Sequence, residues 1–335
     1  MTQPASTPVS WRCSVSIEVR KPGLSTTVQD TGRSGYYDVG IPPSGALDLY
    51  SLTTGNRLVG NPPDAGALEV VYMGPELLFT EDAVVAVTGA ELPPRINGEA
   101  RPLWESFPVS AGDVLSFGFV KGGARAYIAV AGGIDVPVVL GSRATYGLGA
   151  LGGMEGRPLV AGDTLPIGAG AGTPGRVLPG DLLPALGKDV EVRVVMGLYD
   201  HVLAPEGRDN FLQTTWTLTP VADRVGFRYK GAELSTIERT PPFGAGQDPS
   251  NIVDAPYPIG SIQVPGGVEP IILHRDAVSG GGYMMVGTVI SGDLDVVAQS
   301  APNTRTRFVE VDMDGALAAR RDYRARSARV AELLA

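Results

Sequence analysis

Short runs of apolar, mostly β-branched residues recur along the chain, and each run is closed by glycine or proline. Such runs, bounded by turn-forming residues at regular spacing, are typical of strands in β-barrels and sandwiches. The 45 glycines and 28 prolines lie largely between the runs and supply the turns. The pattern therefore predicts a mainly β protein, whose clearest strands are AVVAVTGA (83–90), RAYIAVAGG (125–133), VEVRVVMG (190–197), EPIILHRD (269–276) and MMVGTVI (284–290).

Two stretches instead have the character of helices. Residues 44–61 place Ser44 at an N-cap position, supply leucines for a buried side, and carry Gly60 where a left-handed cap would end the helix. Residues 314–335 are rich in alanine and arginine, with Leu317 and Val330 among the candidate packing residues.

The length of 335 residues predicts about two domains of roughly 150 residues each. Residues 169–188 are mostly Gly, Pro and Ala with little periodicity, which is typical of an interdomain linker. We therefore expect a disordered tail (1–14), an N-terminal β domain (15–168), the linker (169–188), a C-terminal β-barrel domain (189–312) and a C-terminal helix (313–335).

Charge and cysteine usage exclude several classes of protein. With a formal net charge of −9, the chain is a poor match for nucleic acid or an anionic membrane surface, both of which favour clustered Lys and Arg. The single cysteine, Cys13, cannot form an intrachain disulfide, which fits a reducing compartment. The N-terminus lacks the basic start and apolar core of a secretory signal, and no apolar run reaches the ~18 residues that span a bilayer. We expect a cytoplasmic protein.

Familiar cofactor and metal motifs are missing or lack their context. GLGALG (147–152) has the G-x-G-x-x-G spacing, but no helical pattern follows it, so a glycine-rich loop is the better interpretation. His201 and His274 are far apart and have no ligand partner at metal-site spacing, so we expect no metal; His274 suggests a satisfied histidine at a strand edge.

The remaining chemistry lies in polar side chains set among glycines, starting with VQDTGRSGY (28–36). Glycine lets backbone N–H groups approach a ligand, and arginine can bind a carboxylate or phosphate with two parallel bonds. Such a set suits a small amide or carboxylate and an oxyanion, although Asp and Arg in turns can also simply pair across a loop. The candidates are Gln29, Asp30, Arg33, Arg143, Tyr146, Arg224, Arg228, Gln263, Asp276 and Tyr283.

Several separate stretches, in order, resemble the family of the 5-oxoprolinase C-type subunit, also called KipA-like or allophanate hydrolase subunit 2-like, which includes the carboxyltransferase module of biotin-dependent urea carboxylase. The resemblance covers roughly residues 17–310. It is carried by PGLSTTVQDTGRSGYYDVGIPPSGALDLYSLTTGNRLVGN, ALEVVYMGPELLF, AYIAVAGGIDVPVVLGSRATY, DRVGFR, GSIQVPGGVEPIIL, GGYMMVGTVISGDL and AQSAPNTRTRF. The second half departs more from the family pattern, for example in RDAVSGGGY (275–283), where Ser279 replaces a common Thr.

The resemblance implies two β-barrel domains of the cyclophilin-like fold. It also implies an enzyme subunit that opens 5-oxoproline with ATP, together with a KipI-like B-type partner and a LamB/YcsF-like A-type partner. In that interpretation Asp30 or Asp276 is the acid/base, Arg33, Arg143 and Arg224 bind phosphate or carboxylate, and the other candidates contact the substrate.

Two alternatives stay open. One is a carboxyltransferase that transfers a carboxyl group from carboxybiotin to a urea or amide; no biotin would be attached here, since none of the four lysines lies between methionines. The other is a non-enzymatic KipA-like antagonist of a kinase inhibitor.

Overall fold

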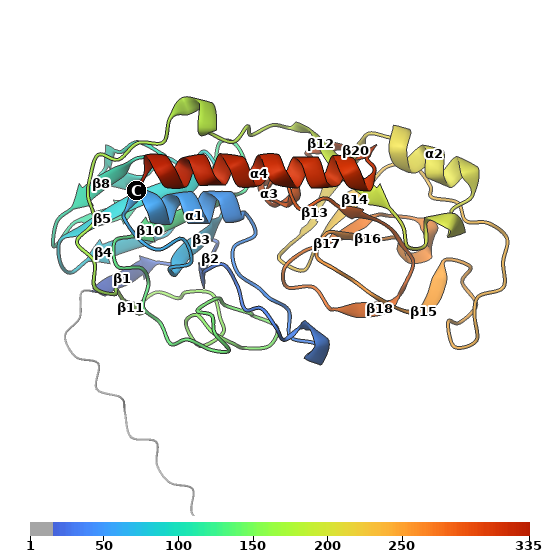
Figure 1. Cartoon of the computed structure of the whole chain (residues 1–335). Helices are drawn as coiled ribbons and strands as arrows, with labels where there is room; N and C mark the ends of the chain where they lie inside the picture. The colour runs from blue at the N-terminus through green and yellow to red at the C-terminus, as the bar shows by residue number, and fades with distance from the viewer. Residues whose placement is uncertain (1–15) are drawn as a thin grey trace, which may run out of the picture.

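The computed structural model, which describes residues 16–335, has two β units side by side, with one long helix lying across both (Figure 1). The prediction of a mainly β fold with few helices is confirmed. Among the described residues the α-helices are α1 (Leu49–Leu58), α2 (Pro205–Gln213), α3 (Leu294–Gln299) and α4 (Met313–Leu333). Four short 3-10 helices lie in the connections between other elements: η1 (Tyr37–Val39), η2 (Gly180–Leu182), η3 (Asp200–Val202) and η4 (Pro265–Gly267).

The first unit consists of two sheets packed face to face. The six-stranded sheet has the order β11 (Thr164–Pro166), β1 (Ser16–Lys21), β4 (Glu76–Phe79), β9 (Val114–Ser116), β6 (Arg95–Ile96) and β7 (Glu99–Ala100). The five-stranded sheet has the order β2 (Ser25–Gln29), β3 (Ala67–Val71), β10 (Arg125–Val130), β5 (Ala83–Gly89) and β8 (Ser106–Val109). Their inner faces share one core, in which Val19 and Phe79 of one sheet meet Leu68 and Ile128 of the other.

Helix α1 explains why two strands of the first unit are apolar on both faces. Ala86 of β5 and Tyr127 of β10 point away from the other sheet and pack instead against Leu52 and Leu58 of α1. A strand covered on both sides loses the polar alternation of a half-exposed strand. This double cover accounts for the continuous apolar runs in the sequence.

The second unit contains a closed β-barrel, as the sequence predicts for this half. The strand order is β12 (Asp189–Met196), β19 (Met285–Val289), β16 (Ser261–Gln263), β17 (Ile271–Leu273), β14 (Gly226–Lys230), β13 (Trp216–Ala222) and β20 (Arg305–Glu310). β20 closes the barrel by pairing with β12 in parallel and with β13 in antiparallel orientation. Aromatic rings fill the interior, where Phe211 stacks on Phe308 at 4.7 Å between ring centroids. A two-stranded sheet, β15 (Asn251–Pro256) with β18 (Gly280–Tyr283), lies beside the barrel (Figure 1).

The start of α1 differs from the expected helix over 44–61. Ser44 has φ 51° and lies five residues before the first residue of the helix, so it is not the N-cap. The N-cap is Asp48, whose side chain accepts from the backbone N–H of Ser51. The end agrees with the prediction, since Gly60 is left-handed at φ 80° just beyond the helix. The expected helix was therefore too long at its N-terminal end.

Helix α4 agrees with the helix expected near residues 314–335, and it contacts both units. Val330 packs in the core that surrounds α1. Tyr323 donates its hydroxyl to Asp295 of α3 at 2.7 Å, and the Arg326 guanidinium lies 4.0 Å from the ring centroid of Tyr50. The helix also packs on β12 of the barrel (Figure 1). Helix α4 therefore packs against both units and connects them.

The domain boundaries expected at the linker (169–188) and at the tail (1–14) remain predictions. Within residues 169–188, Leu178 and Leu182 are buried in the α1 core, so this segment packs on the first unit. The expected tail (1–14) and Cys13 lie outside the described residues. Over residues 16–335, no helix combines the length and apolarity needed to cross a membrane.

Candidate functional site

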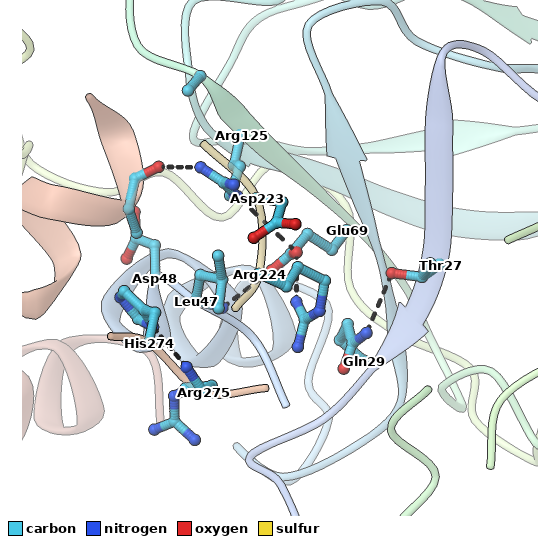
Figure 2. A network of polar contacts seen from close by, with 12 residues as sticks. Thr27, Gln29, Leu47, Asp48, Glu69, Arg125, Asp223, Arg224, His274 and Arg275 are labelled. Carbon is cyan, nitrogen blue, oxygen red and sulfur yellow. Dashed lines mark hydrogen bonds and ion pairs between the residues drawn. The ribbon is translucent and has the colours of Figure 1, made fainter. Parts of the chain in front are cut away.

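A buried carboxylate, Glu69 of β3, lies at the centre of the polar contacts between the two units (Figure 2). It accepts from the backbone N–H of Leu47 at 2.9 Å and from the Tyr127 hydroxyl at 2.8 Å. Its other oxygen accepts from Nη1 of Arg224, a residue of the barrel unit, at 2.6 Å. Burial opposes ionisation, but Arg224 and Arg125 together hold the pKa of Glu69 below its ordinary value.

Arg224 uses every nitrogen of its guanidinium to join the units. Besides the bond to Glu69, Nε and Nη2 bind the two oxygens of Asp276 at 2.8 and 3.1 Å, and Nη2 also donates to the carbonyl of Gly45 at 2.7 Å. Burial alone would lower the pKa of Arg224, but the two carboxylates raise it above its ordinary value. Because all of its nitrogens are engaged, Arg224 holds protein groups in place and does not offer a free cation.

Asp30 accepts hydrogen bonds from two loops that the sequence analysis treated as separate stretches. Its Oδ1 accepts from the Gly32 N–H and the Ser142 hydroxyl, both at 2.7 Å, and its Oδ2 accepts from the Arg143 N–H at 2.6 Å. The side chain is 6% exposed. The stretch 28–36 and the stretch 142–145 are therefore joined through this carboxylate, as expected for an Asp that organises a loop.

Gln29 and Arg33 lie beside Asp30 but leave polar atoms without partners. Gln29 donates its amide N–H groups to Thr27 Oγ1 and to the Thr145 carbonyl, at 3.0 and 3.1 Å, and Arg33 donates from Nη2 to the Ala144 carbonyl. Within residues 16–335, Gln29 Oε1 and both Nε and Nη1 of Arg33 have no partner. Burial lowers the pKa of Arg33, although Asp30 and Asp276 act against this.

Tyr146 and Arg143 lie at the edges of this cluster. Burial, and then the charge of Asp276, raises the pKa of Tyr146, which places the phenol within the field of that carboxylate. Arg143 pairs with Asp135 at 2.6 Å, in a contact that is half open to solvent. The structure thus gathers Gln29, Asp30, Arg33, Arg143, Tyr146, Arg224 and Asp276 at the junction of the two units.

The other three candidates lie elsewhere on the barrel unit. The Tyr257 hydroxyl donates to the carbonyl of Tyr283 at 2.6 Å and also interacts with the side chain of Gln263. Arg228 alternates with buried Phe227 along β14, so it points out of the barrel, where it pairs with Glu269 at 3.2 Å. These residues are not part of the Glu69 cluster.

The expectation of an edge position for His274 is wrong. The ring is fully buried beside Phe227, with its Nδ1 accepting from the Arg275 N–H at 3.0 Å. Burial, reinforced by Arg275, keeps the pKa of His274 well below its ordinary value, so the ring is neutral. Among the residues that the structure describes, no group of three His, Cys, Asp or Glu side chains could hold a metal ion.

The sequence did not single out Glu69, Asp48 or Asp295 as site residues. Glu69 and Asp48 are buried and Asp295 is partly buried between the units. Asp48 accepts from Gln299 of α3 at 2.7 Å, and Asp295 accepts from the N–H of Leu49 at 3.0 Å. One signal was available, because Glu69 is a lone charge inside the apolar run ALEVV (67–71). Such a charge is almost never buried without a partner.

The chain is similar in sequence and in structure to several known proteins. Residues 39–310 match the family model described as carboxyltransferase domain, subdomain A and B. The chain is 34% identical to the C-type subunit of the Escherichia coli 5-oxoprolinase, with 91% of this chain and 94% of that protein covered. It is 36% identical to the urea amidolyase of Lachancea kluyveri, with 88% of this chain but only 17% of that protein covered. The crystal structure of the K. lactis urea amidolyase superimposes with a TM-score of 0.90 at 34% identity, covering 96% of this chain and 20% of that one.

Proposed function

The chain belongs to the carboxyltransferase domain A and B family, and on that premise we propose that it is the C-type subunit of an ATP-dependent 5-oxoprolinase. The observation that carries the proposal is the similarity to the C-type subunit of the E. coli 5-oxoprolinase, which extends over 94% of that protein. Whatever that relative contributes to its enzyme is therefore contained almost entirely in the stretch that the two chains share. We expect the protein to act in the cytoplasm with a KipI-like B-type partner and a LamB/YcsF-like A-type partner.

The proposed reaction opens a lactam, and the cluster at the junction of the units offers groups for it. Phosphoryl transfer from ATP to the lactam oxygen, with loss of ADP, would activate the ring carbon toward water. Water would add to that carbon, the C–N bond would break with a proton delivered to nitrogen, and a second water would release phosphate. Each step needs an acid or base that is held in a defined position.

Asp276 is the better candidate for that acid or base. The paired bonds from Arg224 fix its orientation, yet each carboxylate oxygen can accept a second hydrogen bond. Tyr146 lies in its electrostatic field and is a second polar group for the same substrate. Asp30 is more heavily engaged by protein donors, so we assign it the positioning of the loops that carry Gln29 and Arg33.

The test is ATP turnover by this protein assembled with its A-type and B-type partners, with and without 5-oxoproline. The proposal expects 5-oxoproline to stimulate ADP release and glutamate to appear. Asp276→Asn should reduce turnover by at least ~100-fold, the size of a general acid–base contribution. Arg305→Gln is the matched control, because its ion pair with Asp189 is exposed on the barrel surface. An assembled, folded complex that 5-oxoproline does not stimulate would rule the proposal out.

A carboxyltransferase role is the second candidate, favoured by the TM-score of 0.90 against the K. lactis urea amidolyase. The same amide and guanidinium groups would face the ureido ring of carboxybiotin, which would supply the carboxyl group when bound, and an amide acceptor. This role predicts that urea or an amide, and not 5-oxoproline, stimulates turnover in the presence of a biotin carrier and a biotin carboxylase.

A further inference from the structure

Among the described residues, Arg33 keeps two unpaired guanidinium nitrogens, more than any other arginine of the cluster; Arg143 keeps one, its Nε. Arg224 commits all of its nitrogens to Glu69, Asp276 and Gly45, and Arg143 pairs with Asp135. The Arg33 side chain is 1% exposed and donates only from Nη2, to the Ala144 carbonyl. Across the described part of the chain, its Nε and Nη1 meet no acceptor. A buried cation in this state is expensive, and a bound anion would relieve the cost.

Two further unpaired groups belong to residues that contact the same segments as Arg33. Gln29 donates to the carbonyl of Thr145 and Arg33 to that of Ala144, so both side chains bind the segment 144–145. Because the Gln29 amide nitrogen faces Thr145, its Oε1 is left as an unpaired acceptor. The hydroxyl of Ser44 is also unpaired within residues 16–335. Ser44 directly follows Pro43, whose carbonyl accepts from the backbone N–H of Arg33 at 2.7 Å.

The nearby carboxylates do not satisfy Arg33. Asp30 is occupied by three donors on its own and a neighbouring loop, and Asp276 is held by Arg224. These three residues therefore offer unused guanidinium donors, one unused amide acceptor and one hydroxyl. A ligand that complements this set has a carboxylate beside an amide N–H.

We infer that Arg33, Gln29 and Ser44 form a buried subsite for a carboxylate that is flanked by an amide N–H. In this subsite Arg33 binds the carboxylate, while Gln29 Oε1 accepts the N–H. The inference rests on the proposed function only in its choice of ligand: 5-oxoproline is a lactam that carries a carboxylate on the carbon next to its ring N–H.

A glycine-rich segment separates this subsite from a wide hollow of about 1000 Å³. Gly152, at φ 67°, lines the hollow and lies so close to Arg33 that a Cβ at this position would come within 2.8 Å of Nη2. Apolar side chains, among them Val139, Leu151 and Met154, form much of the wall of the hollow. Because position 152 has no side chain, the wall of the hollow comes close to the Arg33 guanidinium.

The experiment measures binding to the full chain, assembled with its partner proteins where they are needed, by calorimetry without ATP. The probes are 5-oxoproline, pyrrolidin-2-one, which lacks the carboxylate, N-methyl-5-oxoproline, which lacks the N–H, and inorganic phosphate. Losing the carboxylate should weaken binding by at least about tenfold, as for a hydrogen bond to a charged group. Losing the N–H should weaken it by about two- to tenfold.

Variants then assign these effects to residues. Arg33→Gln should remove the preference for 5-oxoproline over pyrrolidin-2-one, and Arg33→Lys should restore part of it. Arg305→Gln should leave both affinities unchanged, because this residue pairs with Asp189 on the barrel surface. If Arg33→Gln does not fold, the comparison of the four probes on the unmodified protein decides the question.

Three outcomes would overturn the inference. Equal binding of 5-oxoproline and pyrrolidin-2-one would mean that no carboxylate is recognised, and buried water would then satisfy Arg33. Phosphate binding that competes with 5-oxoproline and exceeds it would identify a phosphate site instead. A carboxylate preference that survives Arg33→Gln would place recognition elsewhere. The proposed function fails separately, through absence of ATP turnover in a complex that still binds 5-oxoproline.

Discussion

Replacing Arg224 by methionine tests the contact between the two β units most directly. Its loss would leave Glu69 and Asp276, 1% and 5% exposed, without the cation that bridges them. Removing one partner of a buried ion pair costs about 3–5 kcal/mol. Glu69 keeps its bonds from the Leu47 N–H and the Tyr127 hydroxyl, so we expect the lower end, about 3 kcal/mol. At about 2–4 °C per kcal/mol, Tm would fall by roughly 6–12 °C.

Urea unfolding followed by tryptophan fluorescence would measure this loss in each unit. Trp104 is buried in the first unit and Trp216 lies inside the barrel, so variants that lack Trp11 and keep one of these two report each unit separately. Arg305→Met is the matched control: its ion pair with Asp189 is mostly exposed and should contribute less than about 1 kcal/mol. Adding Glu69→Gln to Arg224→Met should recover part of the loss, because a neutral amide needs no counter-charge. If Arg224→Met costs no more than Arg305→Met, the junction does not depend on this network and the reasoning is wrong.

Three further predictions concern the same junction. Burial raises the pKa of Asp295 to about 7, so the folded state holds a proton that the unfolded state releases above about pH 4. Stability should therefore fall as pH rises from about 4 to 7, by up to about 1.4 kcal/mol per unit, and Asp295→Asn should flatten that slope; an unchanged slope in urea titrations would contradict this. Arg326→Ala should lower stability by about 0.5–2 kcal/mol by removing the cation above the Tyr50 ring, with faster amide exchange in α4 as the check; unchanged exchange would argue against the contact. Asp30→Ala should cost about 1–3 kcal/mol in urea unfolding because buried donors lose their acceptor, whereas Asp30→Asn should cost less; equal costs would mean that hydrogen bonding to Asp30 is not what matters.

Local patterns were enough to predict the strands and the long helix. The run AVVAVTG became β5 because its side chains are buried on both faces, a requirement that apolar composition records directly. The start of α1 could not be predicted in the same way. Ser44 is a good cap by residue type, but its left-handed backbone follows from hydrogen bonding to Arg275, which lies more than 200 positions away in the chain.

The sequence was enough to predict which residue types form the cluster, but not which of its arginines pair with buried carboxylates. The sequence marked Arg33 and Arg224 alike as anion-binding residues, because both are arginines among glycines. In the structure, Arg224 is committed to two buried carboxylates and Arg33 is not. That difference depends on Glu69, which comes from the other unit, and spacing along one sequence does not report such a contact.

The closure of the barrel by β12 and β20 also bears on how the protein folds. These strands pair in parallel between Asp189 and Arg305, so the barrel joins its first strand to its last. Until β20 has been synthesised and has docked, that edge of β12 has no neighbour and is exposed to pairing with other chains. Contacts of such long sequence separation slow folding, because the loop-closure entropy is lost before the contacts form. Barrel closure should therefore be a late and slow event, and the period before it is when this chain is most vulnerable to aggregation.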